Sequence, residues 1–252
     1  MPKIQTTTKI IKLFSNWLSF IADYLKLSNN KYIIYKLRNG ISLKTRSGSV
    51  DKNIIFEILI DKVYTPKGFE INSKDTIVDV GAHIGVFSVY TATLAKQGKV
   101  YAIEPMPDNY ALLQANIELN NLKNIITINE ALSADNEGRN LNVSNSTGGH
   151  SFIFSNNKNG ELGVNTESLS VLFAKHNIQH IDLLKMDCEG AEYEILFNTP
   201  KETMDKIDKI SMECHDIDTE RNSSQLKQFL ESNGFQVTLK TDKCIMLYAK
   251  KV

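Results

Sequence analysis

Short apolar runs alternate with helical segments over the C-terminal two thirds of the chain. These runs are almost continuously apolar, which is typical of strands whose two faces are both covered by helices. We predict strands at 76–80, 99–103, 125–129, 181–186 and 209–214. We predict one helix that ends near residue 95 and four further helices at 107–120, 167–176, 190–197 and 224–232. This alternation indicates βαβ units, and therefore an α/β fold with a mostly parallel sheet.

Two segments depart from the alternation. Residues 235–240 and 243–249 read as strands joined by Thr241-Asp242, which predicts an antiparallel hairpin at one edge of the sheet. Residues 134–165 are rich in Asn, Ser and Gly, with weak strand patterns at 140–144 and 151–154. We interpret this polar stretch as an insertion over the sheet that could serve as a lid.

The N-terminal region has a different pattern. Apolar residues at helical spacing predict one amphipathic helix over 9–26, and Asn39-Gly40 between two apolar runs, 32–37 and 41–45, predicts a hairpin. A further helix is expected at 52–63. We therefore divide the chain into an N-terminal extension, residues 1–68, and a main domain, residues 69–252.

The apolar stretch at 13–22 is too short to span a bilayer, which needs about 20 residues. The helix at 9–26 either packs on the domain or contacts a membrane peripherally through Trp17 and Phe20, which lysines flank. We expect a cytoplasmic protein, with membrane association as the alternative.

Composition narrows the class of protein. The chain has 252 residues, 42% of them hydrophobic, which excludes disordered, collagenous and disulfide-scaffold proteins. Its 29 basic and 29 acidic residues cancel, so no global charge attracts nucleic acid. The three cysteines show no C-x-x-C spacing, which fits a reducing compartment.

A glycine-containing loop follows the first predicted strand. Asp79 ends this strand, and Gly81, Ala82, His83 and Gly85 connect it to the next helix. Glycines here allow an unusual backbone conformation and a close approach of a ligand to the main chain. Ala82 and His83 replace the G-x-G-x-x-G spacing that favours a pyrophosphate.

An acid stands at the end of the next predicted strand. Glu104, followed by Pro105, lies 23 residues after Gly81. A carboxylate at this place can accept hydrogen bonds from both hydroxyls of an unphosphorylated ribose. The two motifs together predict a nucleoside cofactor, either NAD or S-adenosylmethionine.

Residues 182–192, Asp-Leu-Leu-Lys-Met-Asp-Cys-Glu-Gly-Ala-Glu, resemble the D-L-L-K-x-D-x-E-G-x-E signature of the FkbM family of methyltransferases. The resemblance covers roughly residues 35–250. Other matching positions are Arg46, Asp51, Glu57, Tyr64, Asp79, Gly81, Gly85, Glu104, Pro105, Asn109, Ala131, Leu132, Ser133, Glu213 and His215. Ser170 departs from it, because relatives usually carry an aspartate there.

The resemblance implies a Rossmann-like class I methyltransferase sheet and S-adenosylmethionine as the cofactor. It places Asn109 and Ala131 with the glycine loop and Glu104 at the cofactor. It also implies O-methylation of a small-molecule or glycan hydroxyl, since FkbM relatives methylate sugars and polyketides.

We consider two hypotheses for the chemistry. In the first, His215 is the general base because a neutral imidazole is available near pH 7, and Asp187 or Glu189 orients it, with Lys185 also in the catalytic group. In the second, Asp187, Glu213 and His215 hold a divalent ion, Mg²⁺ or Mn²⁺, that lowers the pKa of the acceptor.

Two other classes of protein stay open at this stage. One is an NAD-type oxidoreductase, and the other is a non-catalytic binding module on the same fold. A nucleic-acid methyltransferase is disfavoured by the neutral charge and by Asp187-Cys188-Glu189-Gly190, which stands where an N-P-P-Y-like run would be. The sequence specifies neither the acceptor nor the oligomeric state.

Overall fold

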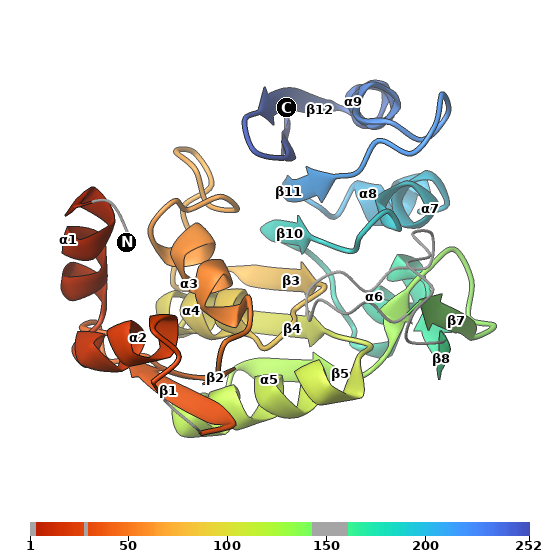
Figure 1. The fold of residues 1–252 in the computed structure, drawn as a ribbon. Coiled ribbons are helices and arrows are strands. Elements are labelled where there is room, and N and C mark those ends of the chain that lie inside the picture. The colour runs from red at the N-terminus through yellow and green to blue at the C-terminus, as the bar shows by residue number, and fades with distance from the viewer. Residues whose placement is uncertain (1–3, 28–29, 143–160) are drawn as a thin grey trace.

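The structure, a computed structural model, describes residues 4–27, 30–142 and 161–252. The centre is a seven-stranded sheet (Figure 1). Its strands are β3 (Thr76–Val80), β4 (Lys99–Ile103), β5 (Ile125–Ile128), β10 (Leu183–Met186), β11 (Lys209–Cys214), β12 (Phe235–Thr241) and β13 (Ile245–Lys251). They follow the order β12-β13-β11-β10-β3-β4-β5, in which β13 is antiparallel to both of its neighbours. This confirms the mostly parallel α/β sheet with an antiparallel hairpin at one edge.

Helices cover both faces of the sheet (Figure 1). They are α4 (Val86–Leu94), α5 (Pro107–Leu119), α6 (Leu169–Lys175), α7 (Glu192–Phe197), α8 (Lys201–Met204) and α9 (Ser223–Ser232). Side chains of β3 alternate between two hydrophobic clusters. Ile77 packs with α4, whereas Val78 and Val80 pack with α6, α7 and α9. The strands are buried on both faces because helices lie on each side, which explains their continuous apolar pattern.

Two boundaries at the edges of the fold differ from the prediction. Thr241 pairs with Ile245, so the last hairpin turns through three residues, 242–244, and not through Thr241-Asp242. The predicted insertion contains a hairpin of β7 (Arg139–Asn142) and β8 (Glu161–Val164), while β6 (Ala131–Leu132) pairs with β9 (Thr166–Glu167). The strand predicted at 151–154 lies outside the described residues, as does most of the segment interpreted as a lid.

The N-terminal helix is interrupted, and the prediction of one helix over 9–26 is wrong. The structure has α1 (Ile4–Leu13) and α2 (Trp17–Tyr24). Asn16 lies between them and bonds to β1 (Tyr32–Lys36): its Nδ2 donates to the carbonyl of Ile34, and its Oδ1 accepts from the amide of Lys36, both at 2.8 Å. Nearby main-chain groups also leave the helix: the amide of Ser15 donates to the carbonyl of Lys36 at 2.8 Å, and the carbonyl of Leu13 accepts from the amide of Arg38 at 2.9 Å.

The extension packs firmly on the main domain. Phe14 and Phe20 stack at 5.4 Å, and both rings meet Phe56 of α3 (Asp51–Leu59). Hairpin β1–β2, whose second strand is Ser42–Arg46, belongs to the same hydrophobic cluster as α4. The expected packing role of the helix is therefore confirmed. Membrane contact through Phe20 is wrong, because this side chain is buried.

A buried carboxylate, Asp23, joins the parts of the extension. It accepts hydrogen bonds from Tyr35, Ser47, the amide of Gly48 and Lys52, at 2.8–2.9 Å. Burial raises the pKa of this carboxyl, but the hydrogen bonds outweigh burial and hold the pKa below its ordinary value. Asp23 thereby ties α2 to the residues that begin α3.

We expect Asp23→Ala to lower the free energy of unfolding by about 3 kcal/mol, because it leaves buried donors and one ammonium without their acceptor. Urea unfolding followed by circular dichroism measures this loss. Since the pKa of Asp23 is lowered in the folded state, the wild type is more stable than the variant at pH values above the ordinary pKa of an aspartate. This difference in the free energy of unfolding is lost as pH falls through the lowered pKa.

The matched control is Asp61→Ala. Asp61 is exposed and pairs with Lys9 at 3.6 Å on the surface, so its removal costs less than about 1 kcal/mol. Equal losses for the two variants would contradict the role given to Asp23.

Candidate active site

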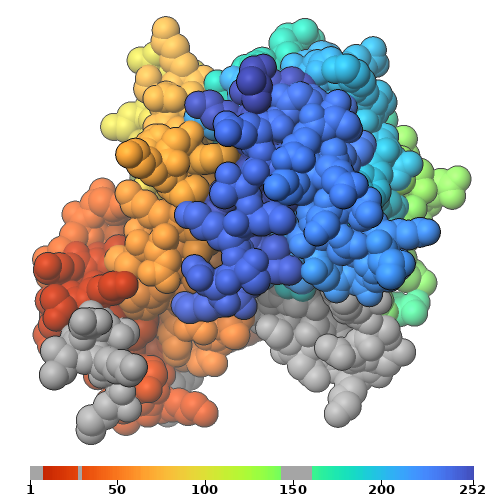
Figure 2. All heavy atoms as spheres, turned by 90° about the horizontal axis from the view of Figure 1, so that it is seen from above, coloured from red at the N-terminus to blue at the C-terminus, as the bar shows by residue number. Residues whose placement is uncertain are grey.

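A cavity of about 620 Å³ opens at the carboxyl ends of β3, β4, β10 and β11. The glycine loop and Glu104 line one side of it. The other side is formed by α3, the loop after it, and the turn between β12 and β13. These last two segments are far apart in the sequence but lie side by side (Figure 2, orange and blue), where Tyr248 donates to the carbonyl of Val63 at 2.7 Å. The cavity is therefore enclosed by the extension as well as by the sheet.

The glycine loop is held against the end of β10. Gly81 has a φ of +73°, and a Cβ added there would lie 1.9 Å from the carbonyl oxygen of Asp187. Only glycine fits this contact. Gly85 also has a positive φ, but its Cα faces Leu113 of α5, and the residue does not line the cavity. Gly81, Ala82 and His83 line it and Gly85 does not, and cofactor contact at all four positions stays a prediction.

His83 shapes the loop. It has a φ of +54°, and burial lowers the pKa of its imidazole to about 4, so the ring is neutral. Nη2 of Arg46 lies 3.1 Å from Nε2 of His83, and Arg46 is itself paired with the buried Asp51. A guanidinium only donates, so Nε2 accepts and the ring proton is on Nδ1. This arrangement agrees with a backbone-shaping role and not with a base.

Glu104 lies at the centre of the cofactor side. It accepts from the amides of His83 at 2.7 Å and Met106 at 3.0 Å, and from Asn109 at 3.3 Å. Burial raises its pKa to about 6 despite these bonds. Pro105, Asn109 and Ala131 line the cavity beside it, where the sequence placed them. Carboxylate oxygens can each accept more than one hydrogen bond, so Glu104 can still bind a hydroxyl donor.

Asp79 and Lys185 form a buried pair on neighbouring strands. Their Oδ1 and Nζ are 2.9 Å apart, and both side chains are nearly inaccessible. Ser88 of α4 donates to Asp79, while Nζ of Lys185 donates to the carbonyl of Gly81 at 2.8 Å. Asp79 does not line the cavity, so a contact of this residue with the cofactor stays a prediction. The ammonium of Lys185 is engaged by protein groups and positions the glycine loop, which argues against a catalytic role.

The other side of the cavity is acidic. Asp187 accepts from the hydroxyl of Tyr64 at 2.8 Å. Glu57, Glu189 and Glu213 line the same space. The pKa of each of these three glutamates is raised by desolvation, and the nearby charge of Asp187 raises it further. The shift brings the pKa of Glu189 to about 7.

His215 lies behind these acids and does not line the cavity. Burial lowers its pKa, but Glu192, Glu189 and Glu213 raise it more, to about 9. Its Nδ1 is 3.0 Å from Glu192, and its Nε2 is 3.5 Å from Glu189. The imidazole is therefore protonated at pH 7. This corrects the hypothesis of a neutral His215 base, and Glu189 is the group that could accept a proton from a bound molecule.

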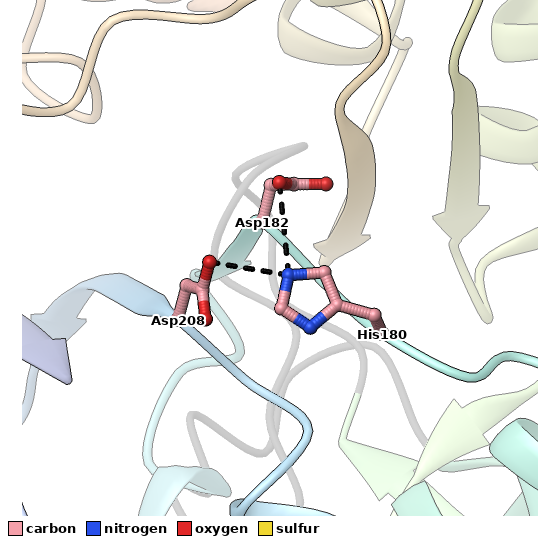
Figure 3. Close-up of side chains that lie close together, drawn as sticks. All are labelled: His180, Asp182 and Asp208. Atoms are coloured by element: carbon pink, nitrogen blue, oxygen red, sulfur yellow. Dashed lines mark hydrogen bonds and ion pairs between the residues drawn. The ribbon is translucent and has the colours of Figure 1, made fainter.

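The predicted metal set does not converge. Among the described residues, three ligating atoms of His, Cys, Asp or Glu lie within 4.8 Å of one another at His180, Asp182 and Asp208, and not at Asp187, Glu213 and His215 (Figure 3). The set in Figure 3 is partly exposed, and His180 is paired with Asp208 at 3.1 Å. The donor set proposed from the sequence does not fit a divalent ion, because His215 is protonated and bonded to Glu192.

Sequence reasoning missed two parts of the site. Glu192, which stands in the 182–192 signature without an assigned role, is fully buried and binds His215. Its place three residues after Glu189 in the signature was the available signal. Lys240, Lys243 and Cys244 also line the cavity, and no local pattern could show that their turn folds over α3.

Comparisons with known proteins agree with the fold and the cavity described above. The family model described as the methyltransferase FkbM domain matches residues 79–237. The chain belongs to the FkbM methyltransferase family. Similar proteins include methyltransferase 1 of Beauveria bassiana, which is 28% identical over 77% of this chain and 88% of its own length. Another is the 31-O-demethyl-FK506 methyltransferase FkbM of Streptomyces tacrolimicus, 23% identical over 82% of this chain and 90% of its own.

Solved structures share the class I methyltransferase fold. An FkbM methyltransferase of Methylobacillus flagellatus has a TM-score of 0.53 and 16% identity over 75% of this chain, which spans about half, 47%, of that protein. TYW2 of M. jannaschii in complex with AdoMet has a TM-score of 0.51 and 20% identity, with 89% of each chain covered. FkbM membership favours the methyltransferase over the NAD-type oxidoreductase. Within the described part of the chain, every helix is too short or too polar to cross a bilayer.

The contact between Gly81 and Asp187 gives a prediction for this FkbM protein. We expect Gly81→Ala to lower the free energy of unfolding by roughly 3 kcal/mol, from the left-handed φ and the overlap with the backbone of Asp187. Gly40→Ala is the matched control, because Gly40 also has a positive φ but nothing lies within 4 Å of the added Cβ. The control should lose only about 1 kcal/mol. Thermal unfolding of both variants measures the difference, and similar losses would show that the contact is not tight.

Proposed function

We propose that this protein is an S-adenosylmethionine-dependent O-methyltransferase that acts on a hydroxyl of a sugar, a glycan or a small natural product. The observation that carries the proposal is the placement of Glu189. This carboxylate, with a pKa of about 7, lines the same cavity as the glycine loop and Glu104. A group that can take a proton at neutral pH therefore faces the space next to the cofactor side.

The residues present fit the proposed cofactor. The cavity volume is within the range of small-molecule sites. Glu104 can accept from ribose hydroxyls, and the backbone of Gly81 and Ala82 lets a ligand come close. When bound, S-adenosylmethionine supplies an electrophilic methyl group on a positively charged sulfur. TYW2, which has the same fold, was crystallised with AdoMet, and this also supports the proposal.

Glu189 is the proposed general base. Its carboxylate would take the hydroxyl proton of the acceptor as the acceptor oxygen gains the methyl group, while the bond from that methyl group to the cofactor sulfur breaks and its electron pair stays on the sulfur. His215 holds this carboxylate from behind, at 3.5 Å, and its positive charge lowers the pKa of Glu189. Glu192 in turn keeps His215 protonated. No step requires a metal ion in this arrangement.

The acceptor side suits a molecule that donates hydrogen bonds. Glu57, Asp187 and Glu213 offer carboxylate oxygens, which accept from hydroxyl groups. The same charges disfavour phosphate groups, in line with the expectation that nucleic acid is not the substrate. The name of the Streptomyces relative, a 31-O-demethyl-FK506 methyltransferase, supports an oxygen acceptor.

Cofactor binding is tested by thermal unfolding. We expect S-adenosylhomocysteine at 100 times its dissociation constant to stabilise the protein by about 2.7 kcal/mol, and NAD⁺ to give no shift. Glu104→Gln should weaken binding at least tenfold in calorimetry, whereas Glu118→Gln, on the exposed face of α5, should not change it. Stabilisation by NAD⁺ alone would contradict the cofactor assignment.

The pH dependence of methyl transfer tests the base, with an acceptor found by screening glycosides and hydroxylated natural products. We expect kcat/KM to rise with pH through about 7, where Glu189 ionises, and to fall above about 9, where His215 loses its proton. Glu189→Gln should lose at least about 100-fold. The exposed Glu202→Gln should keep full activity.

The variant His215→Asn separates the role of His215, whose charge acts on Glu189, from the role of Glu189 as the base. Because the His215 charge lowers the pKa of Glu189, its removal should move the rising limb to higher pH. A variant that keeps the wild-type profile would show that His215 does not act on Glu189. Binding of S-adenosylhomocysteine without turnover of any acceptor would instead favour the non-catalytic module.

A further inference from the structure

Charge is distributed unevenly along the chain. The first 50 residues contain nine lysines and arginines and a single acid, Asp23, although the chain as a whole is balanced. Asp23 is buried and bonded to four groups of the extension. Every exposed charged side chain described between residues 8 and 50 is therefore basic. These side chains are Lys9, Lys12, Lys26, Lys31, Lys36 and Arg38.

Helix α2 has an inverted pattern. Its one charged residue, Asp23, points inward together with Phe20. Leu18 and Leu25 are seven residues apart and lie on the opposite side, whereas Ile21 between them is partly buried and packs against the core. Leu18 is 64% exposed and Leu25 is 55% exposed. A surface helix of a soluble protein normally turns its apolar side inward, so this outward apolar stripe needs a partner.

The stripe is part of a larger apolar surface. Of the twelve large hydrophobic side chains exposed in the described structure, seven lie between residues 11 and 50. We call six of them the N-terminal face: Ile11, Leu18, Tyr24, Leu25, Leu27 and Ile34. Hydrogen bonds join the elements that carry this face, from Arg38 to the carbonyl of Ile11 and from Asn16 to that of Ile34. The elements α1, α2 and β1 lie together at one side of the molecule (Figure 1).

We propose that the N-terminal face docks on an anionic membrane surface. Exposed leucines insert among the lipid headgroups and acyl chains, and surrounding lysines are attracted by anionic lipids. The face has both components, and the exposed acid Asp61, 3.6 Å from Lys9, offsets only one of the surrounding lysines. The inserting residues are thus Leu18, Leu25 and Leu27, with Phe20 committed to the core.

A second copy of the chain fits this face poorly. In a twofold dimer the same patch meets itself, so its mainly basic residues would face the basic residues of the other copy. A nucleic acid would use the lysines but would gain little from leucines, since single strands bind through aromatic stacking and phosphate contacts. A lipid surface uses both kinds of side chain.

Vesicle co-sedimentation of the full chain tests the proposal. We expect binding to phosphatidylcholine vesicles with about 30% phosphatidylglycerol, weaker binding at high salt, and little binding to phosphatidylcholine alone. Leu18→Ser with Leu25→Ser should weaken binding at least about tenfold. Lys12→Glu with Lys26→Glu should do the same, because each basic residue contributes about fivefold.

The matched control is Leu119→Ser with Val171→Ser, which removes exposed apolar side chains from α5 and α6. It should bind vesicles as the wild type does. Circular dichroism and S-adenosylhomocysteine binding verify that each variant is folded, and the assay needs no methyl acceptor.

The proposal is overturned if the protein does not bind anionic vesicles, or if the Leu18/Leu25 and control variants bind equally. It is also overturned if gel filtration shows a dimer that the leucine changes dissolve. Binding of an RNA oligonucleotide that is tighter than vesicle binding and independent of both leucines would overturn it too.

Discussion

The buried pair of Lys185 and Asp79 fixes the centre of the molecule. It links two neighbouring parallel strands, β10 and β3, and the same ammonium holds the carbonyl of Gly81 in the loop that follows β3. Because a charge deep in the protein is stable only with its partner, neither residue can be lost alone. The loop therefore keeps one conformation relative to β10, and the cavity forms between the two.

The sequence predicts the scaffold well because its signals are local. The strands at 76–80 and 99–103 were placed with their correct bounds, since burial on both faces makes their sequences almost entirely apolar. The helix over 9–26 failed for a tertiary reason. Asn16 bonds to a hairpin that begins 16 residues later, and no local spacing shows this.

Candidate site residues divide in the same way. Glu104 and Gly81 were found because their places at strand ends follow from the fold. His215 was assigned the wrong role, and the burial of Asp79 was not foreseen, because protonation and accessibility depend on neighbours from other elements. The buried Glu192 keeps the imidazole of His215 positively charged, and the carboxylate of Asp79 is paired with the ammonium of Lys185. Residue type can be read from a sequence, whereas the electrostatic environment requires the packed structure.

The tight approach of Gly81 to the carbonyl of Asp187 has a consequence for how this enzyme fold diversifies. Main-chain atoms set the spacing between the two halves of the cavity, so alignment does not depend on the side chains that face the acceptor. Asp187 and Glu213 come from the ends of central strands, but the other side chains on that side come from α3 and from the turn at 242–244, which are peripheral to the sheet. Changes there can reshape the acceptor pocket while the geometry of transfer is conserved, which gives one scaffold access to many substrates.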